Sequence, residues 1–309
     1  MNLELLEQLV SIRGASSDES RIKDFIINYV KKNMETWKVK PLILDGEEMQ
    51  DTLVLVFGKP RTAIYAHTDS IGFSVGYDND LIKIGGPRLT DGIQLVGSDS
   101  KGEIEVELAL YEDDHGKAHP HCLGERQLDR GTILTFKPDF RETEKYIQSP
   151  YMDNRLGVWV ALQVAETLEN GAIVFSTYEE HGGNTVGYSA NLLWEKYKVR
   201  QALIADITWV TDGVKHDGGV AISMRDQGLP RRKYLNRIID LARESKVDFQ
   251  LEVESAGGSD GGVLQKADTL IDWCFIGAAE DNVHSPDEKV YKSDILSMVN
   301  LYQYLMKHL

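Results

Sequence analysis

Histidine and carboxylate side chains stand at or just beyond the ends of several apolar, strand-like runs of this sequence. Six residues share that position: His67, Asp69, Glu179, Glu180, Asp206 and His284. Ligands of open α/β sheets bind beyond the carboxyl ends of the strands, so we expect these side chains to converge at one sheet edge. Such a cluster would repel and desolvate itself without a cation, so the pattern predicts a site for divalent metal ions.

Each residue also has an ordinary interpretation when it is taken singly. A histidine at a strand end is usually a hydrogen-bonded structural residue, and a glutamate pair in a turn is usually solvated. The joint pattern favours the metal site. A second candidate, His119-Pro-His121, has no second ligand pair nearby, so we do not expect it to bind metal.

Asp153 stands just before a run with helical spacing. The apolar residues Leu156, Val160, Val164 and Leu168 recur every four positions, which predicts a helix over 154–169. This helix should pack on the same sheet as the strands described above. We therefore expect Asp153 to lie near the cluster.

Helices and strands alternate through most of the remaining chain. Two helices are expected near the start, over 2–12 and 19–32, and Ser16 and Glu19 predict a capping box for the second. The runs 53–57 and 62–67 lie on either side of a short turn and predict a hairpin. After residue 150 we expect strands over 172–177, 201–206, 219–224, 248–253 and 270–276, with helices over 185–197, 231–245, 260–266 and 293–308. This alternation predicts a three-layer α/β domain with a largely parallel central sheet.

The segment 70–148 has a different pattern. Short strand-like runs alternate with Gly- and Asp-rich turns, and no helical pattern longer than one turn occurs. We therefore predict a small β-barrel-like domain inserted over 70–148, with the catalytic domain formed by 1–69 and 149–309.

Composition excludes several classes of partner. The net charge of -15 over 309 residues argues against nucleic acid or an anionic membrane surface. No apolar run approaches the ~18 residues that a membrane span requires, and acidic residues stand where a signal peptide would be basic. We therefore expect a cytoplasmic protein. Two cysteines, Cys122 and Cys274, argue against a disulfide framework.

Six short motifs occur in one order along nearly the whole chain. They are His67-Thr-Asp69-Ser-Ile-Gly-Phe73, Asp153-Asn-Arg155-Leu-Gly157, Glu179-Glu180-His-Gly, Asp206-Ile-Thr208, Gly257-Gly-Ser-Asp260 and His284-Ser-Pro286. In these residues the chain resembles the dinuclear zinc aminopeptidases of the glutamyl-aminopeptidase and tetrahedral-aminopeptidase type. Each motif is weak alone, but six in order are a specific signal.

The resemblance implies a pair of divalent ions ~3.5 to 4 Å apart. These would be zinc, with cobalt or manganese as alternatives. His67 and Asp206 would bind one ion. Glu180 and His284 would bind the other, and Asp153 would bridge both.

The resemblance also assigns roles to two further carboxylates. Glu179 would be the general base that takes a proton from a water or hydroxide bridging the metals. Asp69 would accept a hydrogen bond from the His67 ring nitrogen that faces away from the metal. The resemblance implies in addition a cis peptide bond between Asp153 and Asn154.

Two departures from the family pattern leave specificity and assembly open. The segment 280–283 reads Glu-Asp-Asn-Val where the family usually has an Arg-Tyr pair, and the insert is somewhat short. The first hypothesis is an aminopeptidase that acts on short peptides and forms a homo-oligomer. The alternatives are a carboxypeptidase, a dipeptidase or an N-acyl amino acid deacylase with the same site, and a metal-binding or assembly protein with a silent site.

Overall fold

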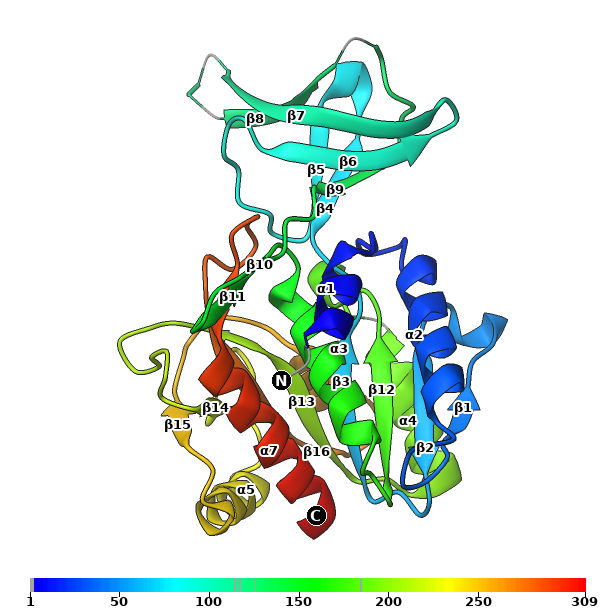
Figure 1. Ribbon diagram of the computed structural model, residues 1–309, viewed down its shortest axis with the longest axis vertical. Helices are drawn as coiled ribbons and strands as arrows, with labels where there is room; N and C mark the ends of the chain where they lie inside the picture. Colours follow the sequence, from blue (N-terminus) through cyan, green and yellow to red (C-terminus); the bar gives the residue numbers. More distant parts are fainter. Residues whose placement is uncertain (1–2, 114, 117, 125, 184) are drawn as a thin grey trace.

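The computed structural model describes residues 3–113, 115–116, 118–124, 126–183 and 185–309. It has a large three-layer α/β part and a smaller antiparallel sheet that stands apart from it (Figure 1). No described helix combines the length and apolarity that would let it cross a membrane.

A large mixed sheet forms the middle layer. Among the described residues its main path runs β1 (Leu42–Leu44), β2 (Leu53–Phe57), β12 (Gly171–Ser176), β3 (Thr62–His67), β13 (Gln201–Trp209), β16 (Asp272–Asp281), β17 (Lys289–Tyr291), β11 (Tyr146–Gln148) and β10 (Arg141–Glu142). The four central strands β12, β3, β13 and β16 are parallel to one another. Two more strands, β14 (Val220–Ser223) and β15 (Phe249–Glu252), branch from β16. The prediction of a parallel sheet is confirmed for the centre.

Helices cover both faces of this sheet. They are α1 (Glu4–Ser11), α2 (Ser20–Asn33), α3 (Met152–Ala165), α4 (Thr185–Tyr197), α5 (Arg232–Ser245), α6 (Asp260–Lys266) and α7 (Lys292–His308), with short 3-10 turns η1 (Glu47–Met49), η2 (Tyr77–Asn79) and η3 (Glu179–His181). In Figure 1, α3 and α7 lie in front of the sheet and α4 lies behind it.

The alternation of side chains along β3 shows why both faces are apolar. Ile64 and Ala66 pack into the core beneath α1, α2, α3, α5 and α7. Ala63 and Tyr65 point the other way, into the core beneath α4 and α6. Successive strand residues face opposite sides, so a strand buried on both faces has to be apolar throughout.

Two of the local predictions were wrong. β2 and β3 do not form a hairpin, because β12 lies between them and pairs antiparallel with β2 and parallel with β3. The four-residue connection spans the width of one strand. α2 has no capping box, because Ser16 and Glu19 bond to other segments and Glu19 at its N-cap makes no side-chain cap bond.

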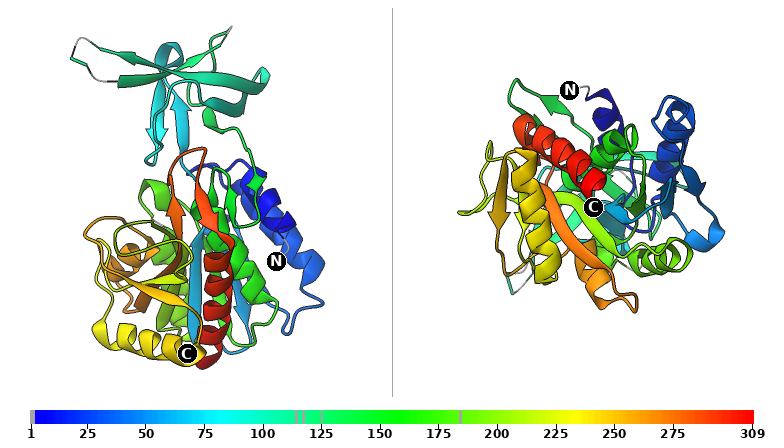
Figure 2. Two further views of the ribbon diagram at one scale, coloured as in Figure 1. Left: turned by 60° about the vertical axis from the view of Figure 1, so that its left-hand side comes forward. Right: turned by 90° about the horizontal axis from the view of Figure 1, so that it is seen from below.

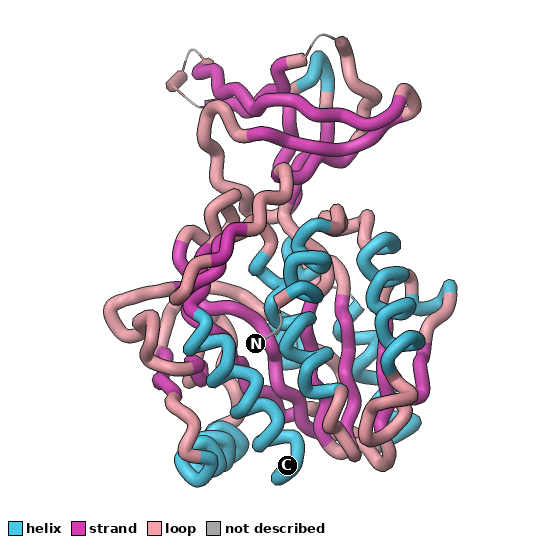
Figure 3. Tube along the Cα trace, in the orientation of Figure 1, coloured by secondary structure: helices cyan, strands magenta, loops and turns pink. Residues whose placement is uncertain are grey.

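The inserted segment forms a six-stranded antiparallel sheet. Its described strands are β5 (Leu81–Ile84), β4 (Gly72–Val75), β9 (Ile133–Phe136), β6 (Gln94–Asp99), β7 (Gly102–Glu112) and β8 (Ala118–Leu123), in that order. The bridge between Asp80 and His121 brings the two ends together, so the sheet is nearly a closed barrel. It has its own apolar core around Phe73, Leu95 and Leu134. Figures 2 and 3 show it joined to the rest by extended connections.

The boundaries of the insert stay a prediction. The barrel-like sheet ends at Phe136, whereas β10 and β11 pair with β17 and so belong to the large sheet. The chain therefore contacts the large sheet again before Ser149.

Candidate metal centre

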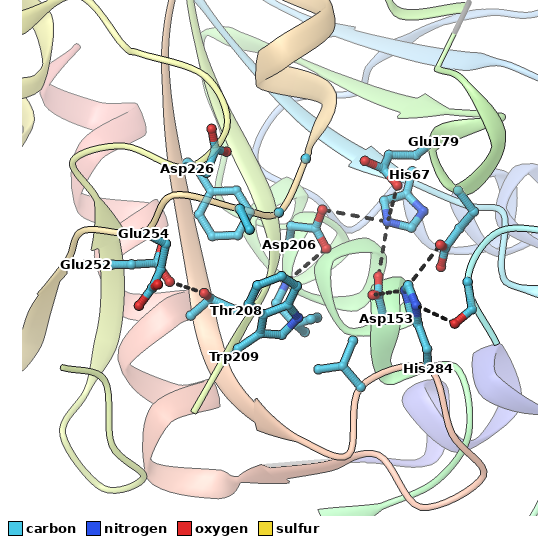
Figure 4. A pocket seen from close by; sticks show the side chains of 18 residues that line it. His67, Asp153, Glu179, Asp206, Thr208, Trp209, Asp226, Glu252, Glu254 and His284 are labelled. Carbon is cyan, nitrogen blue, oxygen red and sulfur yellow. Dashed lines mark hydrogen bonds and ion pairs between the residues drawn. The ribbon is translucent and has the colours of Figure 1, made fainter. Parts of the chain in front are cut away.

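The side chains that the sequence singles out meet at the carboxyl end of the parallel strands. His67 is the last residue of β3, Asp206 lies in β13, and Glu179 lies in η3 directly after β12. Asp153 comes from the start of α3, and His284 from the loop after β16. Figure 4 shows these five side chains pointing toward one another.

Asp153 lies between two groups of side chains and contacts both. Its Oδ1 is 3.2 Å from Nε2 of His67, and its Oδ2 is 3.3 Å from Nε2 of His284. Asp206 Oδ2 lies 3.6 Å from His67 Nε2, and Glu180 Oε2 lies 3.2 Å from His284 Nε2. His67, Asp153 and Asp206 therefore form one group with metal-ligand spacing, and Asp153, Glu180 and His284 form the other.

Main-chain oxygens orient both imidazoles. The Nδ1 atom of His67 lies 3.1 Å from the carbonyl oxygen of Asp69. The Nδ1 atom of His284 lies 3.2 Å from the carbonyl oxygen of Gly86. A ring whose Nδ1 donates to a carbonyl leaves the lone pair of its Nε2 free for a metal.

The carboxylate of Asp69 has more hydrogen-bond partners than the sequence predicted. It lies 3.5 Å from His67 Nδ1, so it is the more distant of the two oxygens near that nitrogen. It also accepts hydrogen bonds from the backbone nitrogens of Glu179 and Glu180, at 3.0 and 3.1 Å, and from Oγ of Ser16 at 2.6 Å. Burial opposes the charge, but His67 and these donors lower the pKa of Asp69. One buried anion therefore joins β3 to η3.

The electrostatics of the cluster suit a cation. Burial, reinforced by Asp153, raises the pKa of Glu180 to about 7, and its Oε1 is buried without a hydrogen-bond partner among the described residues. Burial also raises the pKa of Glu179 well above its usual range and raises that of Asp206. Burial disfavours the charged form of these three acids, and the two histidines only partly offset that effect. Divalent ions on the same oxygens would offset it further, and the mixture of imidazole and carboxylate donors fits them.

The same carboxylates also raise the pKa values of the two histidines, which favours their charged form. Burial alone would lower the pKa of His67, yet the carboxylates of Asp206 and Asp153 raise it well above its usual range. Asp153 and Glu180 raise the pKa of His284 to about 11 against the same opposing effect. Positive charge is therefore favoured at both metal-facing edges.

Two further residues, Glu288 and Asn154, hold the segments that carry the candidate ligands, a role that the sequence reasoning did not assign to them. Fully buried Glu288 accepts hydrogen bonds from the backbone nitrogens of Asp153, at 3.2 Å, and His284, at 2.9 Å. Asn154 donates to the carbonyl oxygen of Ala205 at 2.8 Å and accepts from the nitrogen of Gly157 at 2.9 Å. Glu288 lies outside the motifs, and its contact with Asp153 joins positions 135 apart, so the sequence carried no signal for it.

The peptide bond between Asp153 and Asn154 is cis, so that prediction is confirmed.

The His119-Pro-His121 segment lies in the insert, where His119 contacts Asp113 at 2.9 Å and His121 contacts Asp80 at 3.3 Å. Within the described ranges, only the two groups that share Asp153 have metal-ligand spacing.

A cavity of about 280 Å³ opens onto the cluster. Ile207, Trp209, Phe275 and Val283 give it an apolar wall. A pocket with apolar walls and a few convergent polar groups is the usual form of a small-substrate site.

Comparisons of the sequence with known proteins point to one family. The sequence profile described as M42 glutamyl aminopeptidase matches residues 118–301, more than half of the chain. A protein of Acetivibrio thermocellus named as an aminopeptidase is 26% identical, with 96% of each chain covered.

Solved structures share the fold of the whole chain. An aminopeptidase from the archaeon Desulfurococcus kamchatkensis superposes with a TM-score of 0.86 at 20% identity, covering 99% of this chain and 94% of that one. The TET1 peptidase of Pyrococcus horikoshii, described as assembling into a tetrahedron or an octahedral shell, has a TM-score of 0.80 at 20% identity, with 98% of each chain covered.

Proposed function

Because the chain belongs to the M42 glutamyl aminopeptidase family and is a metal-dependent aminopeptidase, we propose that it removes N-terminal residues from short peptides at the cluster around Asp153. The observation that carries this proposal is the position of Asp153, whose two carboxylate oxygens face different ligand groups. One carboxylate shared in this way suits a pair of ions.

We propose five protein ligands for two divalent ions. His67 and Asp206 would hold one ion, Glu180 and His284 would hold the other, and Asp153 would be shared between them. Zinc is the proposed ion because it favours mixed imidazole and carboxylate donors, and cobalt or manganese accept the same set. When bound, such ions polarise the scissile carbonyl and lower the pKa of water.

Glu179 is proposed as the general base. Its Oε2 lies 3.9 Å from His67 Nε2, yet Glu179 belongs to neither ligand group, so its carboxylate stays free to move a proton. Burial raises its pKa well above the usual range, which suits a group that takes a proton from water and later gives it to the leaving amine. Asp69 is a positioning residue, because it holds the backbone of Glu179.

We also propose three properties that were expected from the sequence: the assembly, the domain boundaries and the location of the protein. The resemblance to the TET1 assembly favours a homo-oligomer. The separate cores of the two sheets favour a catalytic domain of 1–69 and 149–309 with an insert of 70–148. The cytoplasmic location expected from the sequence stays a prediction.

The test is hydrolysis by zinc-loaded protein of a panel of aminoacyl-amidomethylcoumarins, N-acetyl amino acids and dipeptides. The proposal predicts cleavage of substrates with a free N-terminal amine only. Glu179→Gln should lower kcat about 10²- to 10⁴-fold, since general-base catalysis contributes on that scale. Its zinc content should stay at the wild-type value, because Glu179 is not a proposed ligand.

Glu244→Gln is the matched control, since Glu244 is an exposed residue of α5 outside the cavity. It should keep wild-type kcat. Cleavage of the acetylated substrates alone would favour the deacylase alternative. Full activity of Glu179→Gln would remove Glu179 from the mechanism.

A further inference from the structure

The cavity has a second, acidic end that the metal site does not use. Asp226, Glu252 and Glu254 line it on the side away from His67 and His284, as Figure 4 shows. We call these three residues the acidic end. The sequence reasoning assigned them no role.

Glu252 is the most deeply placed member of the acidic end. It is the last residue of β15 and is 3% exposed. Oγ1 of Thr208 donates a hydrogen bond to its Oε1. Thr208 stands two residues after Asp206 in β13, so both side chains project from the same face of that strand. The acidic end is thereby tied to the strand that carries a proposed metal ligand.

The protein balances little of the charge at the acidic end, because burial raises the pKa of Asp226 and the nearby positive charge of Arg225 only partly opposes this rise. Among the ion pairs of the described residues, none involves Asp226, Glu252 or Glu254, although Glu252 is buried. Burial raises the pKa of Glu252, and the nearby carboxylates of Glu254 and Asp226 raise it further. A buried carboxylate without a counter-charge costs free energy, which a cationic ligand would recover.

The two glutamates are freer to bind a ligand than Asp226 is. Oδ1 of Asp226 accepts from the backbone nitrogen of Gly228, and its Oδ2 accepts from Oγ of Ser259 at 3.3 Å. Asp226 therefore holds the loop that borders the cavity. Glu254 is half-buried and follows β15 by two residues, beside Glu252.

The wall between the metal cluster and the acidic end is aromatic. Trp209 and Phe275 both line the cavity, and Trp209 is 41% exposed. The methylene stem of lysine or arginine packs well on such rings, while its charged head extends beyond them to carboxylates.

We infer that the acidic end receives the side chain of the first substrate residue, and that the enzyme prefers a basic residue, lysine or arginine, at this position. The inference rests on the proposed aminopeptidase function. An aminopeptidase has no substrate residue before the first one, and the remainder of the peptide must lead out to solvent. Glu252 at the acidic end is 3% exposed, so this end suits the first side chain better than the remainder of the peptide, and the same carboxylates disfavour a glutamyl residue.

The test compares kcat/KM of zinc-loaded protein on lysyl-, arginyl-, norleucyl-, leucyl- and glutamyl-amidomethylcoumarin. Norleucine has the stem of lysine without its ammonium group, so the lysine-to-norleucine ratio isolates the charge. We expect this ratio to be about tenfold or more, equivalent to about 1.4 kcal/mol, and glutamyl to be the poorest substrate. A ratio of one or below would overturn the inference.

The double variant Glu252→Gln/Glu254→Gln tests the residues. Glutamine can still accept the Thr208 hydrogen bond, so the fold should be kept, which circular dichroism and the thermal midpoint check. We expect the lysine-to-norleucine ratio to fall to about one, whereas Glu244→Gln, which removes a negative charge outside the cavity, should keep the wild-type ratio. An equal loss on both substrates would show that the glutamates act only on structure and would overturn the assignment.

Two dipeptides distinguish the first substrate position from the second. Lys-Leu should be cleaved faster than Leu-Leu, and Leu-Lys should gain nothing over Leu-Leu. A gain confined to Leu-Lys would overturn the placement at the first position. Wild-type protein that cleaves leucyl and norleucyl substrates best refutes the inference alone, whereas no cleavage of any free-amine substrate refutes the proposed function.

Discussion

Asp153 and Asp69 show how single carboxylates organise the centre. Asp153 directs its two oxygens to different histidines, while Asp69 accepts hydrogen bonds from the backbone that follows β12. The first arrangement suits a shared ligand, and the second fixes the turn that carries Glu179. Both carboxylates are buried, which is tolerable because each has several donors or positive groups around it.

The buried acids Glu19 and Asp260 predict a pH dependence of stability at the residue scale. Burial, with a contribution from Asp69, raises the pKa of Glu19 to about 7, and burial raises that of Asp260 to about 7. An acid whose pKa is higher when folded contributes stability below its unfolded pKa, about 4.3 for a glutamate. That contribution is lost as pH rises through the folded pKa.

We therefore expect the free energy of unfolding of metal-free protein to fall between about pH 5 and pH 8. Urea denaturation at several pH values measures it. Glu19→Gln should reduce this slope, because glutamine does not titrate, whereas Glu244→Gln should not. A free energy that rises across this window, or an unchanged slope in Glu19→Gln, would contradict the prediction.

Residue types and their order were enough to predict the metal-ligand cluster, but not the residues that hold it in place. The side chains that follow the parallel strands meet because the carboxyl ends of such strands share one edge. Glu288 acts on the backbone of Asp153, 135 positions away, and Ser16 acts on Asp69, 53 positions away. Nothing in the local sequence encodes such contacts. Glu252 escaped notice for the same reason, since its partner Thr208 lies in another strand.

Helix α3 and strand β13 are held together by a close approach at Gly157. A Cβ atom at Gly157 would lie 2.1 Å from the carbonyl oxygen of Ala205, which is adjacent to Asp206. The absence of a side chain therefore lets the start of α3 bring Asp153 beside β13. This is a structural reason for glycine in the Asp153-Asn-Arg155-Leu-Gly157 motif.

Two glycine substitutions test this element-scale account. Gly157→Ala should lower the free energy of unfolding by about 1–3 kcal/mol through overpacking, and should also reduce activity by displacing Asp153. Gly187→Ala in α4 is the control, because a Cβ atom there would have no atom of the described residues beyond its own helix backbone and chain neighbours within 4 Å. It should be neutral or stabilising by about 0.5 kcal/mol. Urea denaturation gives both values, and equal effects would contradict the account.

Helices and strands were predictable where their hydrophobic periodicity was strong, but the pairing between strands was not predictable. The helices and strands after residue 150 occur close to their predicted ranges, because each is apolar on the faces it buries. The hairpin prediction failed because a short turn between two apolar runs does not reveal that β12 enters between them. β10, β11 and β17 were missed because strands of two or three residues carry no readable period.

The molecule combines a large mixed sheet, whose strands help to line the substrate cavity, with a smaller barrel-like sheet. The fold class was predictable because the composition changes sharply near residues 70 and 150. Assembly is not encoded in any motif. The similar TET1 peptidase is described as assembling into a tetrahedron or an octahedral shell.

We predict that the native protein is larger than one 34.7 kDa chain. Light scattering coupled to size exclusion should give a mass that is an integer multiple of the chain mass. Closed symmetric assemblies are the usual form of homo-oligomers. A single-chain mass across the working concentration range would contradict this prediction while leaving the proposed chemistry untouched.

The central claim concerns two ions that share Asp153, and anomalous diffraction at the zinc absorption edge tests it most directly. In crystals of zinc-saturated protein, the account predicts two peaks per chain, about 3.5 to 4 Å apart. One peak should lie among His67, Asp153 and Asp206, and the other among Asp153, Glu180 and His284. A lone peak that does not contact Asp153, or no peak at this cluster, would contradict the account.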